Sequence, residues 1–245
     1  MRKLVNAVLV SLLLALLILG LLELQKYVKD DAENIALRDQ VVKVSKEDPG
    51  DPFDRFIDFD ALKQMNPDIK GWVYVPGTSI DYPILVGRTD TEYLYKNYKG
   101  RYSSIGAIFS YAGVDVTYDS HVCLFGHNMI SGKMFSELRK YKEEGYALDR
   151  LKAYVYTPDR TKELSLVSVF SCNKKDPIFE VVNKRADSSD VTLLNSVRDR
   201  SLVRTPEVTN YSGQIYSLAT CDGYNGTSKR MTVHYAVTRE KYNID

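Results

Sequence analysis

The chain has 245 residues, of which 44% are hydrophobic and 27% are charged, with 33 Lys and Arg side chains against 32 Asp and Glu. This balance excludes a disordered polar tail and a multi-pass membrane protein, because both need a more extreme composition. The formal net charge of +1 gives no broad cationic field, so we expect no nucleic-acid partner. The length allows one large domain, with or without an appendage, to bury a sizeable core.

The N-terminus carries an uncharged apolar run at residues 4–22, preceded by Arg2 and Lys3 and followed by Glu23. A helix needs roughly 20 apolar residues to cross the hydrocarbon core of a bilayer, and this run is close to that length. The positive-inside rule then keeps the N-terminus in the cytoplasm and places the rest of the chain outside. A cleaved signal peptide is the alternative, but the run is long for one and no clear Ala-x-Ala site follows it. We therefore expect residues 1–22 to be a cytoplasmic end and a retained single-pass anchor in the cell membrane.

The exported part divides into a linker and one domain. Residues 23–52 are charged, poor in aromatics and free of strand alternation, which is typical of a helical or flexible stalk. The domain is expected at 53–245. Its first segment, 53–65, has apolar positions at near-helical spacing before Asn66-Pro67, and this spacing predicts an amphipathic helix.

After this segment the sequence consists of short apolar runs separated by turn residues, a pattern that indicates a mainly β fold. We expect eight strands, at 71–75, 82–86, 105–110, 121–125, 152–156, 164–170, 214–220 and 231–237. Eight strands with such breaks suggest a closed or nearly closed β-barrel. Two helices are expected as insertions, at 134–145 and at 191–200, the second after a Ser-Ser-Asp cap.

The three cysteines differ in their surroundings. An odd number excludes a full disulfide framework, so at least one thiol is free. Cys123 lies inside an apolar run and Cys172 closes another, so we expect both to be buried and inert. Cys221 ends a strand and precedes a turn that contains Gly223 and Gly226. A thiol at that position is accessible, as a nucleophile requires.

One of the three histidines stands out. His121 and His234 lie at the start and inside of strands, where a packed or hydrogen-bonded role is the usual one. His127 follows Gly126 at a strand end and precedes Asn128, a corner that exposes an imidazole for general acid or base chemistry. From the residues alone, a structural role for His127 stays equally open. No CxxC or HExxH spacing occurs, so we expect no metal site and no cofactor.

Arg230 is the third candidate, since it opens a strand nine positions after Cys221. A strand, a turn and the next antiparallel strand bring these two residues side by side, and a guanidinium there suits an acyl oxyanion. The alternative is a surface arginine that pairs with Asp222. Cys221, His127 and Arg230 together favour acyl transfer, which needs a nucleophile, a proton shuttle and an oxyanion donor.

These residues carry a family resemblance that runs from about 53 to 237. The segment 217–221, Ser-Leu-Ala-Thr-Cys, resembles the Thr-Leu-x-Thr-Cys signature of sortases. Gly-His-Asn-Met at 126–129 is similar to the histidine segment of class B sortases, with Met-Phe following at 134–135. The segment 66–83 resembles the opening of the class B barrel, and Arg-Met-Thr-Val-His at 230–234 resembles its arginine strand. Two departures are Ser217 in place of the usual Thr, and Ala219 in a variable slot, which leaves the signal preference open.

The resemblance implies a fold and a site. Sortases are membrane-anchored cysteine transpeptidases of Gram-positive bacteria with an eight-stranded barrel, and class B members add N-terminal helices and a helix between strands six and seven. By motif, Cys221 is the implied nucleophile, His127 the general acid and base, and Arg230 the oxyanion and substrate clamp. Thr220 and Ala219 are the implied substrate-binding positions.

The resemblance also implies the reaction. The cysteine attacks a Thr–Gly or Thr–Asn type bond in the C-terminal sorting signal of a surface protein or pilin and forms a thioacyl enzyme. An amine from a cell-wall precursor or a pilin lysine then releases the joined product, without a cofactor. Three alternatives stay open: a secreted cysteine hydrolase or peptidase that acts on cell-wall peptides, an L,D-transpeptidase, and a non-enzymatic adhesin.

Overall fold

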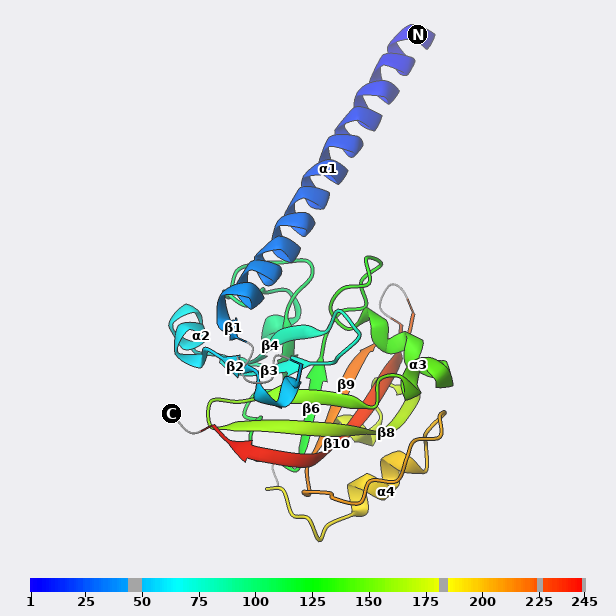
Figure 1. Cartoon of the computed structure of the whole chain (residues 1–245). Helices are drawn as coiled ribbons and strands as arrows, with labels where there is room; N and C mark the ends of the chain where they lie inside the picture. Colours follow the sequence, from blue (N-terminus) through cyan, green and yellow to red (C-terminus); the bar gives the residue numbers. More distant parts are fainter. Residues whose placement is uncertain (44–49, 181–184, 224–226, 244–245) are drawn as a thin grey trace.

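The computed structural model describes residues 1–43, 50–180, 185–223 and 227–243 (Figure 1). The stretch 44–49 of the expected linker and Gly226 of the turn after Cys221 lie outside the described residues.

Eight strands close into a barrel in the order β10-β8-β7-β3-β4-β5-β6-β9, which confirms the expected architecture. Their bounds are β3 Ile69–Tyr74, β4 Asp81–Val86, β5 Ile108–Ser110, β6 His121–Phe125, β7 Lys152–Tyr156, β8 Arg160–Asn173, β9 Ile215–Cys221 and β10 Lys229–Tyr242. The pairs β4–β5 and β6–β9 are parallel, and the other neighbours are antiparallel. Strands β8 and β10 exceed the expected lengths because their pairing continues past the apolar core into charged residues such as Arg239 and Glu240.

The helices depart from expectation in two places. The described helices are α1 Arg2–Val41, α2 Phe59–Met65, α3 Glu144–Leu148 and α4 Thr192–Arg198, with 3-10 turns η1 Pro52–Asp54, η2 Glu92–Leu94, η3 Ser136–Lys142 and η4 Pro177–Phe179. The single helix expected at 53–65 is wrong, because β2 (Phe56–Ile57) pairs with β1 (Val42–Lys43) and Asp58 caps a shorter α2. The helix expected at 134–145 is also broken, since Glu143 adopts an extended conformation between η3 and α3.

Helix α4 lies between β8 and β9, the sixth and seventh strands of the barrel, as the class B resemblance implied. Its Leu194 and Val197 belong to the same buried apolar cluster as Phe170 and Ala219, on the outer face of the sheet. Strand β9 is consequently buried from Ile215 to Thr220, with one face toward the barrel interior and the other beneath this cover. A strand that is buried on both faces holds the residue at its end in a fixed place.

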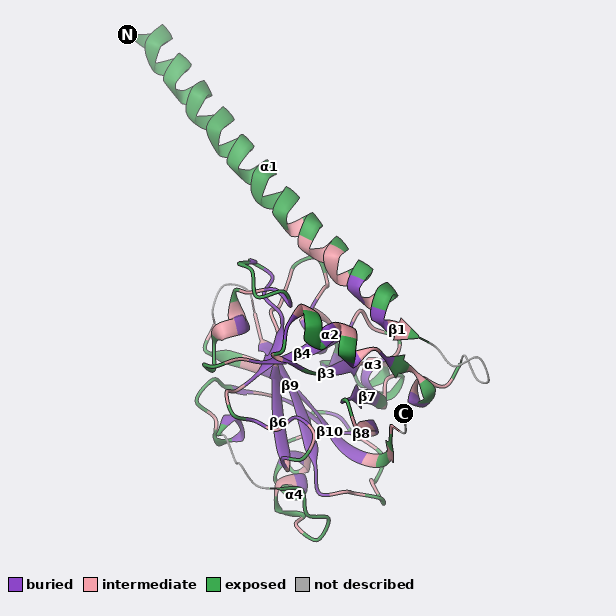
Figure 2. Ribbon diagram, turned by 90° about the vertical axis from the view of Figure 1, so that its left-hand side faces the viewer, coloured by how far each residue is buried: buried purple, intermediate pink, exposed green. Residues whose placement is uncertain are grey.

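Helix α1 is continuous from Arg2 to Val41, so the part of the expected stalk that the structure describes before residue 42 is helical. Its apolar N-terminal part is exposed along its length, whereas Leu37 and Val41 near its end are buried against the barrel (Figure 2). By length and composition α1 is able to cross a membrane. Among the described residues it is the one helix that meets this test.

Candidate active site

The nucleophile candidate lies at the end of a buried strand. Cys221 is the last residue of β9 and is partly exposed, while Cys123 and Cys172 are buried, as expected; all three are free. Burial raises the pKa of the Cys172 thiol to about 11 and that of Cys123 higher still. A thiolate is the reactive form of cysteine, so neither buried thiol is suited to nucleophilic chemistry.

Arg230 stands directly opposite Cys221 in the register of β9 and β10. Its Nη1 atom donates hydrogen bonds to the carbonyl oxygens of Thr227, at 2.7 Å, and Lys229, at 3.1 Å. These bonds tie one end of the guanidinium to the turn before β10. A guanidinium has five N–H donors, so donors remain for a bound group.

Asp222, the alternative partner for Arg230, interacts with other side chains. Asp222 accepts hydrogen bonds from the Lys142 ammonium, at 2.8 Å to each oxygen, and from the Ser171 hydroxyl, at 2.6 Å. Burial acts to raise the pKa of Asp222, yet these two donors hold it below its usual value. Within the described ranges no ion pair joins Arg230 to Asp222, so the interpretation of Arg230 as the surface partner of Asp222 is wrong.

His127 follows β6, which runs parallel to β9 with Phe125 paired to Ala219. The register continues through a hydrogen bond from the Gly126 amide to the Ala219 carbonyl, at 3.2 Å. His127 and Cys221 each come two residues after this pair, so the two parallel strands deliver them to the same edge of the barrel.

Gly126 allows this approach because it has no side chain. A Cβ atom there would lie 2.5 Å from Ile108 Cδ1 and 2.9 Å from the Phe135 ring, closer than packed atoms stand. A side chain at position 126 would therefore displace Ile108 or Phe135, and glycine lets the backbone pass close to both before His127. Phe135 closes the following loop, since its amide donates to the His127 carbonyl at 3.2 Å.

The His127 imidazole is oriented by the segment between β4 and β5. Its Nε2 atom bonds to the Leu94 carbonyl oxygen at 2.7 Å, and its ring lies 5.6 Å from the ring of Tyr95. A carbonyl oxygen accepts only, so Nε2 carries the proton and Nδ1 is left as the basic nitrogen. Within the described residues no hydrogen bond joins this imidazole to the Cys221 thiol.

Asn128 links the two strand ends. Its side-chain amide donates to the carbonyl oxygens of Cys221 and Gly223, both at 3.1 Å. Sequence reasoning named Asn128 only as part of a motif and missed Leu94 altogether. Position 128 beside the histidine was a usable signal, but Leu94 contributes a backbone atom, which no side-chain pattern reveals.

Thr220 and Ala219 have buried side chains. Their relative exposures are 2% and 1%, and the Thr220 hydroxyl donates to the Gly126 carbonyl at 2.8 Å. The substrate-binding role that the resemblance implied for these two residues stays a prediction. The Thr220 hydrogen bond fixes the strand end that precedes His127.

The other two histidines form a buried network. The Ser217 hydroxyl lies 2.7 Å from His121 Nε2 and 2.7 Å from His234 Nδ1, while His234 Nε2 lies 2.9 Å from the Thr232 hydroxyl. Burial lowers the pKa of His121 to about 4 and also holds that of His234 well below its usual value. Both were expected to be hydrogen-bonded, and they are. In the part of the chain that the structure describes, no cluster of three His, Cys, Asp or Glu is placed to hold a metal ion.

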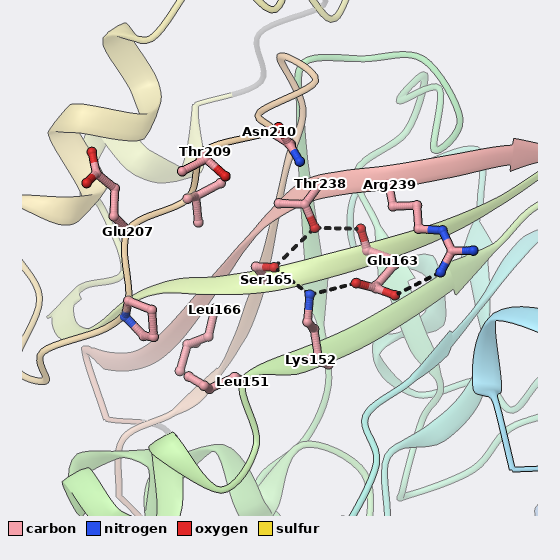
Figure 3. A pocket seen from close by; sticks show the side chains of 12 residues that line it. Leu151, Lys152, Glu163, Ser165, Leu166, Glu207, Thr209, Asn210, Thr238 and Arg239 are labelled. Atoms are coloured by element: carbon pink, nitrogen blue, oxygen red, sulfur yellow. Dashed lines mark hydrogen bonds and ion pairs between the residues drawn. The ribbon is translucent and has the colours of Figure 1, made fainter.

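A pocket of about 390 Å³ lies away from these residues, on the outer surface of β7, β8 and β10 (Figure 3). Glu163 is central to it, with Lys152 at 2.6 Å and Arg239 at 3.9 Å. Cys221, His127 and Arg230 do not line this pocket. The candidate active site is therefore at the barrel edge and not in this hollow.

The chain is similar to proteins named sortase B. It is 28% identical to sortase B of Listeria monocytogenes over 164 residues, which span 66% of this chain and 65% of that protein, just under two thirds. It is 24% identical to sortase B of Staphylococcus aureus over 241 residues, or 95% of this chain and 96% of that protein. The crystal structure of sortase B from B. anthracis in complex with AAEK1 covers 88% of this chain and 99% of its own, at 25% identity and a TM-score of 0.71. No protein-family model matches the chain.

Proposed function

We infer that this chain, which belongs to the sortase B family, is a cysteine transpeptidase that works at the outer face of the cell membrane. One observation carries the assignment: β9, β10 and β6 bring Cys221, Arg230 and His127 to one edge of the barrel. Acyl transfer needs a nucleophile, an oxyanion donor and a proton shuttle, and these three residues supply them.

The first half-reaction is cleavage. His127 Nδ1 takes the proton of the Cys221 thiol, and the thiolate attacks the carbonyl carbon of Thr in a Thr–Gly or Thr–Asn type bond of a sorting signal. The carbonyl π electrons move to oxygen, where the Arg230 guanidinium donates hydrogen bonds to the developing negative charge. The tetrahedral centre collapses, the C–N bond breaks, and the leaving amine takes its proton from His127. The product is a thioester on Cys221.

The second half-reaction is transfer. An amine of a cell-wall precursor or a pilin lysine gives a proton to His127 and attacks the thioester carbon. Collapse of this centre breaks the C–S bond and forms an amide, and the leaving Cys221 sulfur takes the proton from His127 and returns to the thiol. The acyl donor is a surface protein or pilin whose sorting signal stays near the membrane. Anchoring the enzyme through α1 raises its effective concentration toward such a substrate.

The test uses the full-length protein in detergent with sorting-signal peptides that contain Thr–Gly or Thr–Asn bonds, with and without an added amine. Mass spectrometry is expected to find the joined peptide with the wild type and neither cleavage nor joining with Cys221→Ala. Cys123→Ala and Cys172→Ala are the matched controls, and both should keep activity because their thiols are buried. Joining by Cys221→Ala would overturn the assignment. Release of free acid alone, at a rate independent of the amine, would indicate a cysteine hydrolase instead.

A further inference from the structure

Helix α1 is bound to the barrel through two loops. It reaches the loop after β6 through Tyr27, whose hydroxyl bonds to the Ser131 hydroxyl, and through Asp31, which pairs with Lys133 at 3.6 Å. It reaches the loop between β4 and β5 through Asp30, which bonds to the Ser103 hydroxyl. The helix is thus held at several points, and its direction relative to the barrel is set.

A charged cluster strengthens the second attachment. Glu33 pairs with Arg101 at 2.6 Å and with Lys99 at 3.3 Å, and its backbone carbonyl accepts a hydrogen bond from Tyr98. Burial acts to raise the pKa of Glu33, but Lys99 and Arg101 hold it below its usual value. The carboxylate therefore stays ionised and paired at neutral pH.

These two loops are the ones that adjoin His127. The loop after β6 contains His127 itself as its second residue, and the loop between β4 and β5 carries Leu94, whose carbonyl oxygen accepts its Nε2 hydrogen bond. In Figure 1 α1 leaves the barrel on the side where these loops lie, and α4 lies at the opposite end. The apolar part of α1 and the candidate active site are consequently on one side of the molecule.

The distance from this side to the bilayer follows from helix geometry. Tyr27, which contacts Ser131, comes five residues after Leu22, the last residue of the uncharged run. At about 1.5 Å per residue, the contact lies about 7.5 Å along α1 from the hydrocarbon boundary. Side chains on a helix lean toward its N-terminus, which shortens this distance. The headgroup region is about 5–8 Å deep on each side of a bilayer, so the loops reach it.

The two loops expose an apolar side chain and an aromatic side chain at their tips. Ile130, beside Ser131, is 89% exposed, and Tyr102, beside Ser103, is 76% exposed. Several of the charges around them are paired: Lys26 lies 2.7 Å from Glu23, in addition to the pairs made by Asp31 and Glu33. Exposed Ile and Tyr beside a membrane anchor suit the interface of a bilayer, where an apolar body and a polar tip are both satisfied.

We propose that the rim of the active site, at Ile130 and Tyr102, rests in the headgroup layer of the bilayer that α1 spans. The partner is the lipid surface itself, and the contact is apolar and not electrostatic. The site then faces the membrane at a fixed height, where a sorting signal held in the same bilayer presents its cleavable bond. This arrangement deepens the proposed function and rests on its membrane-spanning α1.

The experiment measures depth directly. Full-length protein with Cys221→Ser and Ile130→Cys is labelled with a bimane dye and reconstituted in phosphatidylcholine vesicles that contain lipids with a nitroxide in the headgroup. The other two thiols are buried and do not label. The matched control carries Val191→Cys, an exposed position at the start of α4. We expect quenching at position 130 to exceed quenching at 191 by at least threefold, and to change little with 0.5 M salt or with added anionic lipid.

Equal, weak quenching at both positions would overturn the proposal, as would quenching at 130 that disappears in high salt. This readout uses an inactive protein, so it does not depend on transpeptidation. Failure of the peptide-joining test leaves it intact. Conversely, protein that does not float with the vesicles would remove the membrane-spanning role of α1 and this contact together, while the chemistry of Cys221 would stand.

Discussion

Arg230 is the cross-strand partner of Cys221, so the guanidinium and the thiol start from backbone positions that face each other across β9 and β10. The guanidinium is anchored at one nitrogen by the carbonyl oxygens of Thr227 and Lys229. Anchoring a flexible side chain before the reaction removes ordering entropy from the catalytic step. This arrangement is the one that the proposed oxyanion role of Arg230 requires.

Arg230→Lys keeps the positive charge but removes the planar set of donors. If Arg230 donates to the oxyanion, turnover should fall by roughly 10²-fold or more, while substrate binding weakens less. Steady-state kinetics with a sorting peptide measure both quantities. Arg200→Lys is the control, because Arg200 pairs with Asp176 at 2.7 Å on the surface and exposed pairs are worth about 0–1 kcal/mol. Near-normal turnover of Arg230→Lys would remove Arg230 from the site.

His127→Ala should lower transfer by about 10²–10⁴-fold, the usual contribution of general acid–base catalysis. His121→Ala should keep turnover per folded molecule, because His121 is buried beside Ser217 and far from protonation at neutral pH. Initial rates, normalised to the folded fraction from circular dichroism, make the comparison. If His121→Ala or His234→Ala proved to be the inactive variant, that histidine and not His127 would be the general acid and base.

Asn128 offers a test of positioning that does not touch the reacting groups. Asn128→Ala loses the two hydrogen bonds to the carbonyl oxygens of Cys221 and Gly223, and kcat should fall by about tenfold, or about 1.4 kcal/mol, with KM changed less. Asn128→Asp should be worse, because a carboxylate cannot donate and repels both carbonyl oxygens. The same kinetic assay ranks the two variants. An Asp variant as active as wild type would show that these bonds do not hold the strand end.

The sequence predicted most of the barrel, since all eight strands follow apolar runs between turn residues, and the opposition of Cys221 and Arg230 follows from a strand, a turn and a strand. It did not predict the break in the helix at 53–65, because that break depends on Ile57 pairing with Val42, a contact set by the end of α1. Local spacing carries no information on such a partner.

The candidate site was likewise predicted only in part. His127 was predicted because the sequence places it after a glycine at a strand end. Its partner Leu94 was not, because the interaction uses a carbonyl oxygen 33 positions away. The substrate role of Thr220 came from the resemblance alone and stays a prediction. Strand alternation places Thr220 on the same face of β9 as Tyr216 and Leu218, which belong to the barrel interior, and its hydroxyl donates to the Gly126 carbonyl.

Helix α1 makes a topological prediction. Full-length protein should pellet with membranes and retain residues 1–22, since α1 runs without interruption from the apolar segment into the part that packs on the barrel. A reporter fused after Asp245 should be active only outside the cytoplasm. N-terminal sequencing and reporter activity measure the two features. A mature form that starts near Glu23 would show that the segment is a cleaved signal peptide.

The buried histidine network predicts how stability depends on pH. Burial lowers the pKa of His121 to about 4, from about 6.5 when unfolded, and it also lowers the pKa of His234 well below its usual value. Below pH 6.5 the unfolded chain therefore takes up protons that the folded chain does not, and the free energy of unfolding falls as pH falls. Between pH 7.5 and 5 the loss should be about 2 kcal/mol for His121, with a further loss in the same direction from His234, and above pH 7.5 this contribution should be flat. Urea unfolding in detergent at pH 5, 5.5, 6, 6.5 and 7.5 measures the slope. His121→Gln should reduce the slope, because one of the two groups is removed. A free energy of unfolding that stays constant or rises from pH 6.5 to 5 would contradict the assignment of two neutral, buried imidazoles around Ser217.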